Sequence, residues 1–323
     1  MLDGMEATGT IAAPAGPVRA ALWMVGSCAC FTVLTALIRY LSATIDPLEI
    51  VFFRNLFGMA VMLPWLFHRG LGALTTTRLP LHALRALVGL VAMIAWFTAV
   101  SRMNLADAVA LSFTSPLFAT VAAIFLLSEV VRLRRWLAIG AGFLGAMIIL
   151  RPGFAEIPPA ALLVLLSSMA MGFAVSLVKI LTRHDASEPI VFYMVLFLTP
   201  ASLVPALFVW QTPTLDELGL LVALGGMATL GHLCLVRAFA SADATAVLPF
   251  DFVRLPLIAL AGYLVFDETL DVWTGLGAAI ILSSSVYIAH REATHRRVVA
   301  VPTPRLDAAI PVRARSERRD AAE

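Results

Sequence analysis

The sequence Leu-Ile-Arg-Tyr-Leu-Ser at residues 37–42 returns 140 residues later as Leu-Val-Lys-Ile-Leu-Thr at residues 177–182. A second pair follows at a shift of 136 residues: Ala-Asp-Ala-Val-Ala at 106–110 and Ala-Asp-Ala-Thr-Ala at 242–246. Matches in the same order along the chain argue against a chance similarity between apolar segments. The sequence therefore predicts that the chain contains one structural unit twice.

The composition is that of a membrane protein. Of the 323 residues, 60% are hydrophobic and 14% are charged, whereas an ordinary soluble protein carries about 25% charged residues. The mean hydropathy is +0.92. Disorder is excluded because it needs low hydrophobicity and high charge. A net charge of +2 with no long basic stripe speaks against nucleic-acid binding. Cys28, Cys30 and Cys234 lie in apolar stretches and are expected to be buried thiols.

The apolar stretches predict ten membrane-spanning helices, each near the ~20 residues that cross the hydrocarbon core. Helices are expected because lipid cannot satisfy exposed backbone groups. The predicted spans are residues 20–42, 47–67, 80–101, 105–127, 134–150, 158–181, 189–210, 215–239, 244–266 and 272–290.

The repeat divides these helices into two groups of five. The first repeat covers residues 20–150 and the second covers 158–290, with polar tails at 1–19 and 291–323. Five is an odd number, so the second repeat enters the membrane upside down. The predicted fold class is an all-α integral membrane protein of ten transmembrane helices in two inverted repeats. This architecture is typical of transporters, whose substrate site lies near the midplane between the halves.

The basic residues predict the orientation. Cytoplasmic loops carry an excess of Lys and Arg. With both termini inside, eighteen basic residues fall on the cytoplasmic side and three on the other, while Arg54 and Arg254 lie inside spans. Arg69, Arg78 and Arg85 are counted in one cytoplasmic loop. Both termini are therefore expected to be cytoplasmic.

Charged residues at membrane depth are the first candidates for the site, because each costs at least ~2.5–3.5 kcal/mol on insertion scales. Asp251 and Arg254 are three residues apart and share a face of the ninth helix. In one interpretation Arg254 binds an anionic group of the cargo, and Asp251 takes an ammonium group or a coupling proton. In the other, the two form a permanent ion pair that holds the ninth helix to a neighbour.

Three further side chains are candidates for substrate binding or coupling. Arg54 lies roughly 10 Å along the second helix and could bind a carboxylate or serve a structural role. Trp96 and His232 are related by the 136-residue shift, so they are expected at equivalent positions that approach the central cavity from opposite sides. Trp96 could stack on a flat ring or belong to the interfacial aromatic belt. His232 could titrate near neutrality or form an interhelical hydrogen bond.

Hydroxyl and proline residues mark the fourth and ninth helices. A proline removes a helix hydrogen bond and frees a carbonyl. Freed backbone beside hydroxyl groups lines polar cavities in transporters, although a kink for packing is the alternative. The residues are Ser112, Thr114, Ser115 and Pro116 in the fourth helix, and Pro249 and Pro256 in the ninth.

Other residues have expected structural roles. Glu129 and Glu268 follow the fourth and ninth helices and are expected to cap the next helix. Small residues in the fifth and tenth helices predict that these helices pack together or on a second protomer. They are Ala141 and Gly145, and Gly275 and Ala279.

Residues 20–290 resemble the drug/metabolite transporter superfamily in its ten-helix form with two EamA-type domains. The motifs that carry the resemblance are VFFR at 51–54, LSFTSPLF at 111–118, LLSE at 126–129, GFLG at 142–145, RAFASADA at 237–244 and PFDFVRL at 249–255. The resemblance implies a bacterial inner-membrane location and export or import of amino acids and other metabolites. The last motif is similar to bacterial carriers of S-adenosylmethionine and of riboflavin. Arg54 aligns with Met194, so the two halves are not chemically symmetric.

Together these observations predict a secondary transporter that moves a small polar or zwitterionic organic metabolite by alternating access. Its partners would be this substrate, the lipid bilayer and a proton or exchange counter-substrate. The sequence contains no phosphate loop, metal-ligand cluster or nucleophile elbow, so no cofactor, metal or enzymatic activity is expected. Import of S-adenosylmethionine or riboflavin is one alternative, and an intramembrane enzyme or receptor is another. Monomer and homodimer both stay open.

Overall fold

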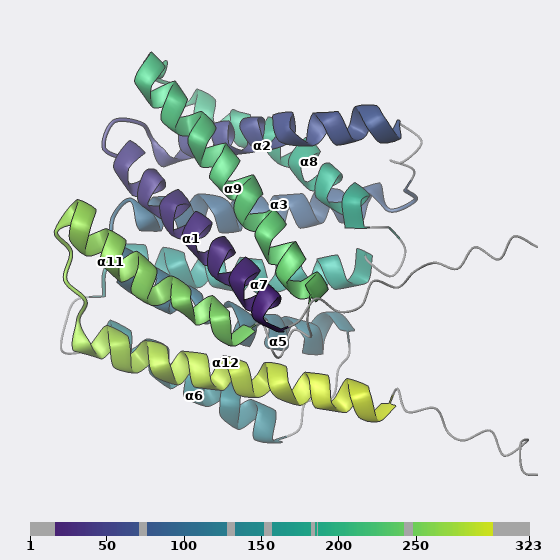
Figure 1. Cartoon of the computed structure of the whole chain (residues 1–323), viewed down its shortest axis with the longest axis vertical. Helices are drawn as coiled ribbons and strands as arrows, with labels where there is room; N and C mark the ends of the chain where they lie inside the picture. The colour runs from purple at the N-terminus through teal and green to yellow at the C-terminus, as the bar shows by residue number, and fades with distance from the viewer. Residues whose placement is uncertain are drawn as a thin grey trace, which may run out of the picture.

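A computed structural model describes residues 17–70, 76–127, 133–151, 157–181, 185, 187–241 and 248–299. Within these ranges the secondary structure is helical throughout (Figure 1). The elements are α1 (Pro17–Leu41), α2 (Pro47–Arg69), α3 (Leu79–Val100), α4 (Leu105–Ser112), α5 (Ser115–Leu127), α6 (Leu133–Leu150), α7 (Pro159–Leu181), α8 (Ser187–Leu207), α9 (Leu215–Ser241), the 3-10 helix η2 (Leu248–Val253), α11 (Arg254–Phe266) and α12 (Val272–Val299).

The helices are apolar enough to build a ten-helix membrane fold. By length and composition, α1, α2, α3, α7, α8, α9 and the segment Leu105–Ala122 of α4 and α5 can each cross a membrane. Shorter apolar stretches run through α6, α11 and α12, over Trp136–Leu150, Arg254–Phe266 and Val272–Tyr287. The predicted fifth, ninth and tenth helices contain these stretches.

Two of the ten predicted helices are not continuous. The fourth, predicted over 105–127, is divided into α4 and α5 by Phe113 and Thr114, next to Pro116, where the sequence predicts freed backbone or a kink. Pro116 lacks the N–H that would bond to the carbonyl of Ser112, and the Thr114 hydroxyl instead donates to the Leu111 carbonyl at 2.7 Å. In the ninth helix, Leu248–Val253 is a 3-10 segment that leads into α11. Residues 244–247 of that prediction lie outside the described residues.

Local sequence explains several helix ends. At the start of α2, the Asp46 carboxylate accepts a hydrogen bond from the Leu48 N–H at 2.9 Å, and Pro47 occupies the first helical position. Gly70 follows the end of α2 with φ 73°, a left-handed conformation that glycine adopts without steric cost. Its N–H donates to the Leu66 carbonyl at 2.8 Å.

The helices pack with a twofold pattern that exchanges the two halves. Helix α1 packs along α9, and the equivalent pair, α7 and α3, packs in the same way. Helix α2 packs on α8, and α6 lies beside α12 along one side of the molecule (Figure 1). Interhelical hydrogen bonds follow the repeat too. Ser27 on α1 donates to the Gly231 carbonyl on α9, and Ser167 on α7 donates to the Ala92 carbonyl on α3. The repeats therefore form one interleaved bundle.

Small residues let α6 and α12 approach closely, as the sequence predicts. A Cβ atom on Gly145 would lie 2.7 Å from the Gly277 carbonyl oxygen, and one on Gly277 would lie 2.5 Å from the Gly145 oxygen. The prediction named Gly275, but a Cβ atom there would meet nothing within 4 Å. The contact lies two residues farther along α12, so the sequence identified the helix pair and missed the residue.

Helix directions give the bundle two chemically distinct ends. Helix α1 begins and α12 ends on the same side (Figure 1). We call this side the Asp185 end, because Asp185 there accepts from the Thr76 hydroxyl at 3.0 Å and lies 2.9 Å from His82 Nε2. The opposite side is the Glu268 end. There Glu268 accepts from the Leu105 N–H at 2.8 Å, so it caps α4 in the other half, and the expectation that it caps the next helix is wrong.

Candidate functional site

The breaks in the two discontinuous helices lie close together in the bundle. Helix α4 contacts α11, and the Arg254 guanidinium lies 5.1 Å from the centre of the Phe113 ring. A cation over an aromatic face is stabilised by the ring quadrupole. The Phe113 carbonyl, freed by the break, accepts a hydrogen bond from the Ser285 hydroxyl at 3.3 Å. Irregular backbone at membrane depth is tolerated where the protein itself satisfies it or where it lines a cavity.

Asp251 and Arg254 meet beside this junction. Their nearest charged atoms, Asp251 Oδ2 and Arg254 Nη2, are 3.8 Å apart, and each side chain keeps about a quarter of its surface accessible, 28% and 25%. The Cys28 thiol on α1 lies 3.7 Å from Asp251 Oδ1. Arg254 Nε is buried without a hydrogen-bond partner. The pair is therefore a loose contact rather than a tight bidentate ion pair.

His232 lies nearby on α9. Its Nδ1 is 2.7 Å from the Ala228 carbonyl one turn earlier, so Nδ1 carries the proton and donates. This bond is within one helix, whereas the structural alternative from the sequence was an interhelical bond. Phe31 on α1 packs edge-on against the imidazole, with ring centres 5.1 Å apart. His232 is an exposed residue of α9.

Two arginines lie within the neighbouring helices α2 and α3. Arg54 on α2 donates to the Asn55 side chain at 3.0 Å, and the Asn55 amide reaches the Ser202 hydroxyl on α8 at 3.3 Å. Arg85 lies inside α3, not in the cytoplasmic loop to which the sequence count assigned it. Both arginines are half-buried, and Arg85 Nε is buried without a hydrogen-bond partner among the described residues.

The remaining candidates are distributed along the two repeats. The Ser112 hydroxyl donates to the Val109 carbonyl at 2.7 Å, so Ser112 and Thr114 both satisfy freed backbone. Ser115 and Pro116 form the first turn of α5, and Pro249 and Pro256 lie in η2 and the first turn of α11. Trp96 is half-buried and packs against the main core. It follows the start of α3 by the same interval as His232 follows the start of α9, which agrees with the predicted equivalence.

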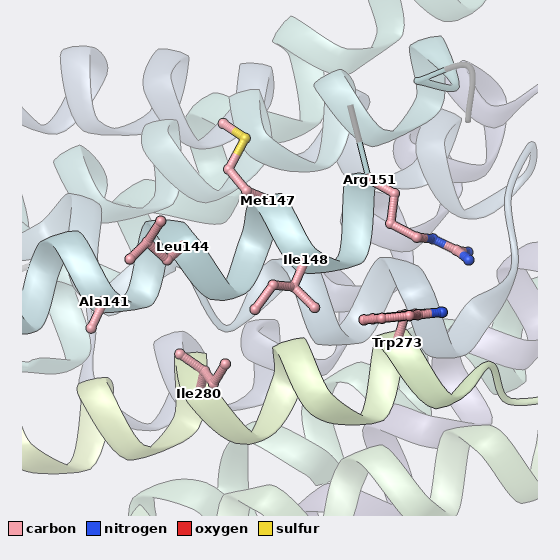
Figure 2. A pocket seen from close by; sticks show the side chains of 7 residues that line it. All are labelled: Ala141, Leu144, Met147, Ile148, Arg151, Trp273 and Ile280. Carbon is pink, nitrogen blue, oxygen red and sulfur yellow. The ribbon is translucent and has the colours of Figure 1, made fainter. Parts of the chain in front are cut away.

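A separate pocket of about 680 Å³ lies between α6 and α12. Its walls are mostly aliphatic, and Arg151 and Trp273 lie at one end (Figure 2). Arg151 pairs with Asp271 at 2.5 Å, so its charge is already matched. None of the sequence-predicted site residues lines this pocket. Among the described residues no group of His, Cys, Asp and Glu could hold a metal ion.

The family model for the EamA-like transporter family matches the chain twice, at residues 18–151 and 158–289. The chain belongs to this family. The EamA family is part of the drug/metabolite transporter superfamily, and this EamA chain is a multi-pass membrane transporter with a small-molecule substrate.

Named relatives of this EamA protein transport different compounds. It is 32% identical to an S-adenosylmethionine uptake transporter of Rickettsia bellii over 79% of this chain and 87% of the relative. It is 34% identical to a riboflavin transporter of Rhizobium johnstonii, over 92% and 99% of the two chains. A pseudopaline exporter of Pseudomonas aeruginosa is also 34% identical, over 79% and 90%. One solved structure, described as a crystal structure of a protein, aligns with a TM-score of 0.55 at 18% identity over 85% of this chain and 99% of its own.

Sequence reasoning missed three groups at this site, namely Arg85, Cys28 and Phe113. The signal for Arg85 was present, because it falls six residues inside the apolar stretch that begins at Leu79. Because Arg85 was counted as a loop residue, it was not identified as a charged residue inside a membrane-spanning helix. Nothing in the sequence pairs Cys28 with Asp251 or Phe113 with Arg254, since each pair joins one half of the chain to the other.

Proposed function

We propose that this transporter imports a small zwitterionic organic metabolite, with S-adenosylmethionine as the first candidate. The observation that carries the proposal is the presence of both signs of charge in one interior region. Asp251 can face a cationic group, while Arg254 can face an acidic group. S-adenosylmethionine carries a carboxylate, an ammonium and a sulfonium centre. Riboflavin is neutral at pH 7 and would leave these charges without partners.

One relative supports import, because its name specifies uptake of S-adenosylmethionine. Two of the three relatives named above carry importer or transporter names for S-adenosylmethionine and riboflavin, and the third is an exporter. Alternating access between the two halves, driven by a proton gradient or by exchange, fits the interleaved repeats. Asp251 beside Cys28 is the group best placed to exchange a proton or to release a cationic cargo group.

Uptake into proteoliposomes tests the cargo. Vesicles that contain the purified full chain should accumulate labelled S-adenosylmethionine, and unlabelled compound inside should accelerate entry by exchange. Labelled riboflavin is the matched comparison, and each compound is measured with and without a pH gradient. Uptake of riboflavin without uptake of S-adenosylmethionine would overturn the proposed cargo and favour the riboflavin alternative.

The proposed location is the bacterial inner membrane with both termini cytoplasmic. The start of α1 and the end of α12 share the Asp185 end, and the basic residues of the sequence favour that side. A reporter that is active only outside the cytoplasm, fused after Ala322, should be inactive. The same reporter inserted between Trp210 and Leu215 should be active. The reverse pattern would overturn the orientation.

A further inference from the structure

The pocket between α6 and α12 lies on the outer surface of the bundle. Its volume is about 680 Å³, and Leu144, Met147 and Trp273, which line it, are all exposed. The apolar stretches Trp136–Leu150 and Val272–Tyr287 run through these two helices. In a membrane, an exposed apolar surface at this depth is surrounded by lipid chains rather than by water. The pocket therefore faces the hydrocarbon of the bilayer.

Two glycines determine the shape of this pocket. Gly145 and Gly277 bring the helix backbones so close that a Cβ atom on Gly145 would lie 2.7 Å from the Gly277 carbonyl oxygen. Side chains beside this contact form the walls, with Leu144 and Ile148 on α6 and Ile280 on α12. The close approach of the backbones thus creates a groove along the line where the two helices meet.

The groove has the length of one lipid leaflet. On α6 its lining runs from Ala141 to Arg151, which are ten residues apart, or roughly 15 Å along the helix axis. The hydrocarbon core of a bilayer is about 30 Å thick, so one leaflet contributes about 15 Å. An acyl chain of one leaflet therefore matches the groove from end to end.

One end of the groove is polar. Figure 2 shows the Arg151 guanidinium and the Trp273 indole nitrogen together at that end, directed away from the aliphatic walls. Arg151 directly follows α6, and Trp273 lies in the first turn of α12, so this end is at the membrane surface on the side of Glu268. Tryptophan is enriched at that level, where its ring is apolar and its N–H can reach a polar partner. The groove therefore fits an amphiphile with its polar group at the surface and its chain along α6.

Both signs of charge are present at the polar end. Arg151 Nη2 lies 2.5 Å from Asp271 Oδ2, and 39% and 36% of the two side chains stay accessible. A guanidinium has five N–H donors and a carboxylate has several lone pairs, so one contact leaves capacity on each for a ligand. Asp107 adds a second carboxylate, since it accepts from Thr274, the residue after Trp273. These charges favour a polar group that carries a phosphate and an ammonium over one that is only anionic.

We propose that the groove between α6 and α12 binds one zwitterionic phospholipid of the phosphatidylethanolamine type. Its acyl chain lies between Leu144 and Ile280, its phosphate accepts from Arg151, and its ammonium donates to Asp271. None of the residues proposed for cargo binding lines this groove, so the inference is independent of the proposed cargo. Because α6 and α12 are the last helices of the two repeats, the bound lipid stabilises their contact.

Native mass spectrometry of the purified full chain tests the polar end. The chain is offered phosphatidylethanolamine and phosphatidylglycerol with the same acyl chains at equal concentration. One phosphatidylethanolamine should be retained per chain, with a preference on the order of 10-fold. Asp271→Asn removes the partner of the ammonium and should reduce this preference to about equal retention. Asp216→Asn, an exposed acid in the first turn of α9, is the control and should keep the preference.

A second pair of variants tests the apolar part. Leu144→Trp fills the groove and should lower retention of phosphatidylethanolamine about 10-fold. Leu162→Trp, at a similarly exposed leucine on α7, should retain the lipid as the wild type does. Added phosphatidylethanolamine should also raise the unfolding temperature of the wild type by about 4 °C, because it binds the folded state, and should leave that of Leu144→Trp unchanged.

Three outcomes would overturn the inference. Equal retention of phosphatidylethanolamine by the two tryptophan variants would remove the groove as its site. A wild-type preference for phosphatidylglycerol would contradict the assigned ammonium contact. A lipid-free dimer that Leu144→Trp dissociates and Leu162→Trp does not would show that a second copy of the chain occupies the groove instead.

Discussion

The Glu268 end and the interior of the bundle treat charge in opposite ways. At the Glu268 end every described charge that joins the halves has a partner: Arg39 pairs with Glu268, Arg151 pairs with Asp271, and Asp107 accepts from the Thr274 hydroxyl. In the interior of the bundle Arg54 donates to the Asn55 side chain, and Arg85 Nε is buried with no hydrogen-bond partner among the described residues. Paired charges hold elements together, whereas unpaired charges favour a ligand. Arginine side chains therefore have different environments at the Glu268 end and in the interior of the bundle.

The Glu268 end also joins the two repeats. Glu268 follows α11 in the second half, yet it caps α4 and pairs with α1 in the first half. If the halves move relative to one another during transport, these contacts must change when that end opens. The interior charges, in contrast, can stay in place and exchange one ligand atom for another.

Substitutions of Asp251 and Arg254 test this contrast most strongly. The two side chains carry opposite charges, and about a quarter of each is accessible. Asp251→Asn and Arg254→Gln should each reduce uptake of S-adenosylmethionine by roughly 100-fold, since each removes a charge that faces the cargo. The partly exposed, loose pair contributes little to stability, so the double variant should fold. Uptake in vesicles, measured with protein abundance and thermal stability, separates the two roles. A well-folded double variant with near wild-type flux would assign the pair a structural role alone.

A substitution at Gly145 tests the packing of α6 against α12 without changing any charge. Gly145→Ala should destabilise the protein by about 3 kcal/mol, at the upper end for overpacking, because its new Cβ atom would meet backbone of α12. Gly140→Ala on the same helix meets nothing within 4 Å and is the matched control. Thermal unfolding of the purified variants measures both. Equal stability of the two variants would contradict the close approach of α6 and α12.

Removal of Glu268 should destabilise the contact between the two halves. Glu268→Ala leaves the Leu105 N–H and Arg39 without their carboxylate, which should cost about 2 kcal/mol in the free energy of unfolding. Asp216→Ala, an exposed acid in the first turn of α9, is the control and should change little. Denaturation of each variant in parallel measures the difference. Equal free energies of unfolding for Glu268→Ala and Asp216→Ala would contradict the stabilising role of Glu268.

The smallest expected effect is at Thr274. Thr274→Val keeps the shape of the side chain and removes the hydroxyl that donates to Asp107 at 2.5 Å, so the loss should be about 1 kcal/mol. Thr229→Val on α9, whose hydroxyl bonds only within its own helix, gives the reference. The unfolding temperature should fall more for the first variant. Uptake should be nearly unchanged in both.

Several features of the fold follow from the sequence because they depend on local pattern. Most of the ten apolar segments match the observed helices closely, as in α7, predicted from 158 and observed from Pro159, but α12 continues to Val299, beyond the predicted end at 290 and into the predicted polar tail. The repeat predicts which helices are equivalent, and Trp96 and His232 occupy corresponding places. The prolines and hydroxyl residues predict disturbed backbone in the fourth and ninth helices, and the structure has a break at Phe113 and the 3-10 helix η2 there, but the sequence does not specify the exact residues at which each helix is interrupted.

The sequence by itself determined the membrane fold, the inverted repeat and the candidates Asp251, Arg254, Arg54 and His232. The length of the apolar segments, the internal repeat and the rare charged residues within the segments can be read directly from the sequence, because none of them depends on contacts between distant residues. The tertiary structure alone decided that Cys28 meets Asp251, that the Ser285 hydroxyl bonds to the Phe113 carbonyl, and that Glu268 caps a helix of the other half. The reason is geometric: inversion brings segments more than one hundred residues apart into contact, and only folding in three dimensions selects which side chains meet.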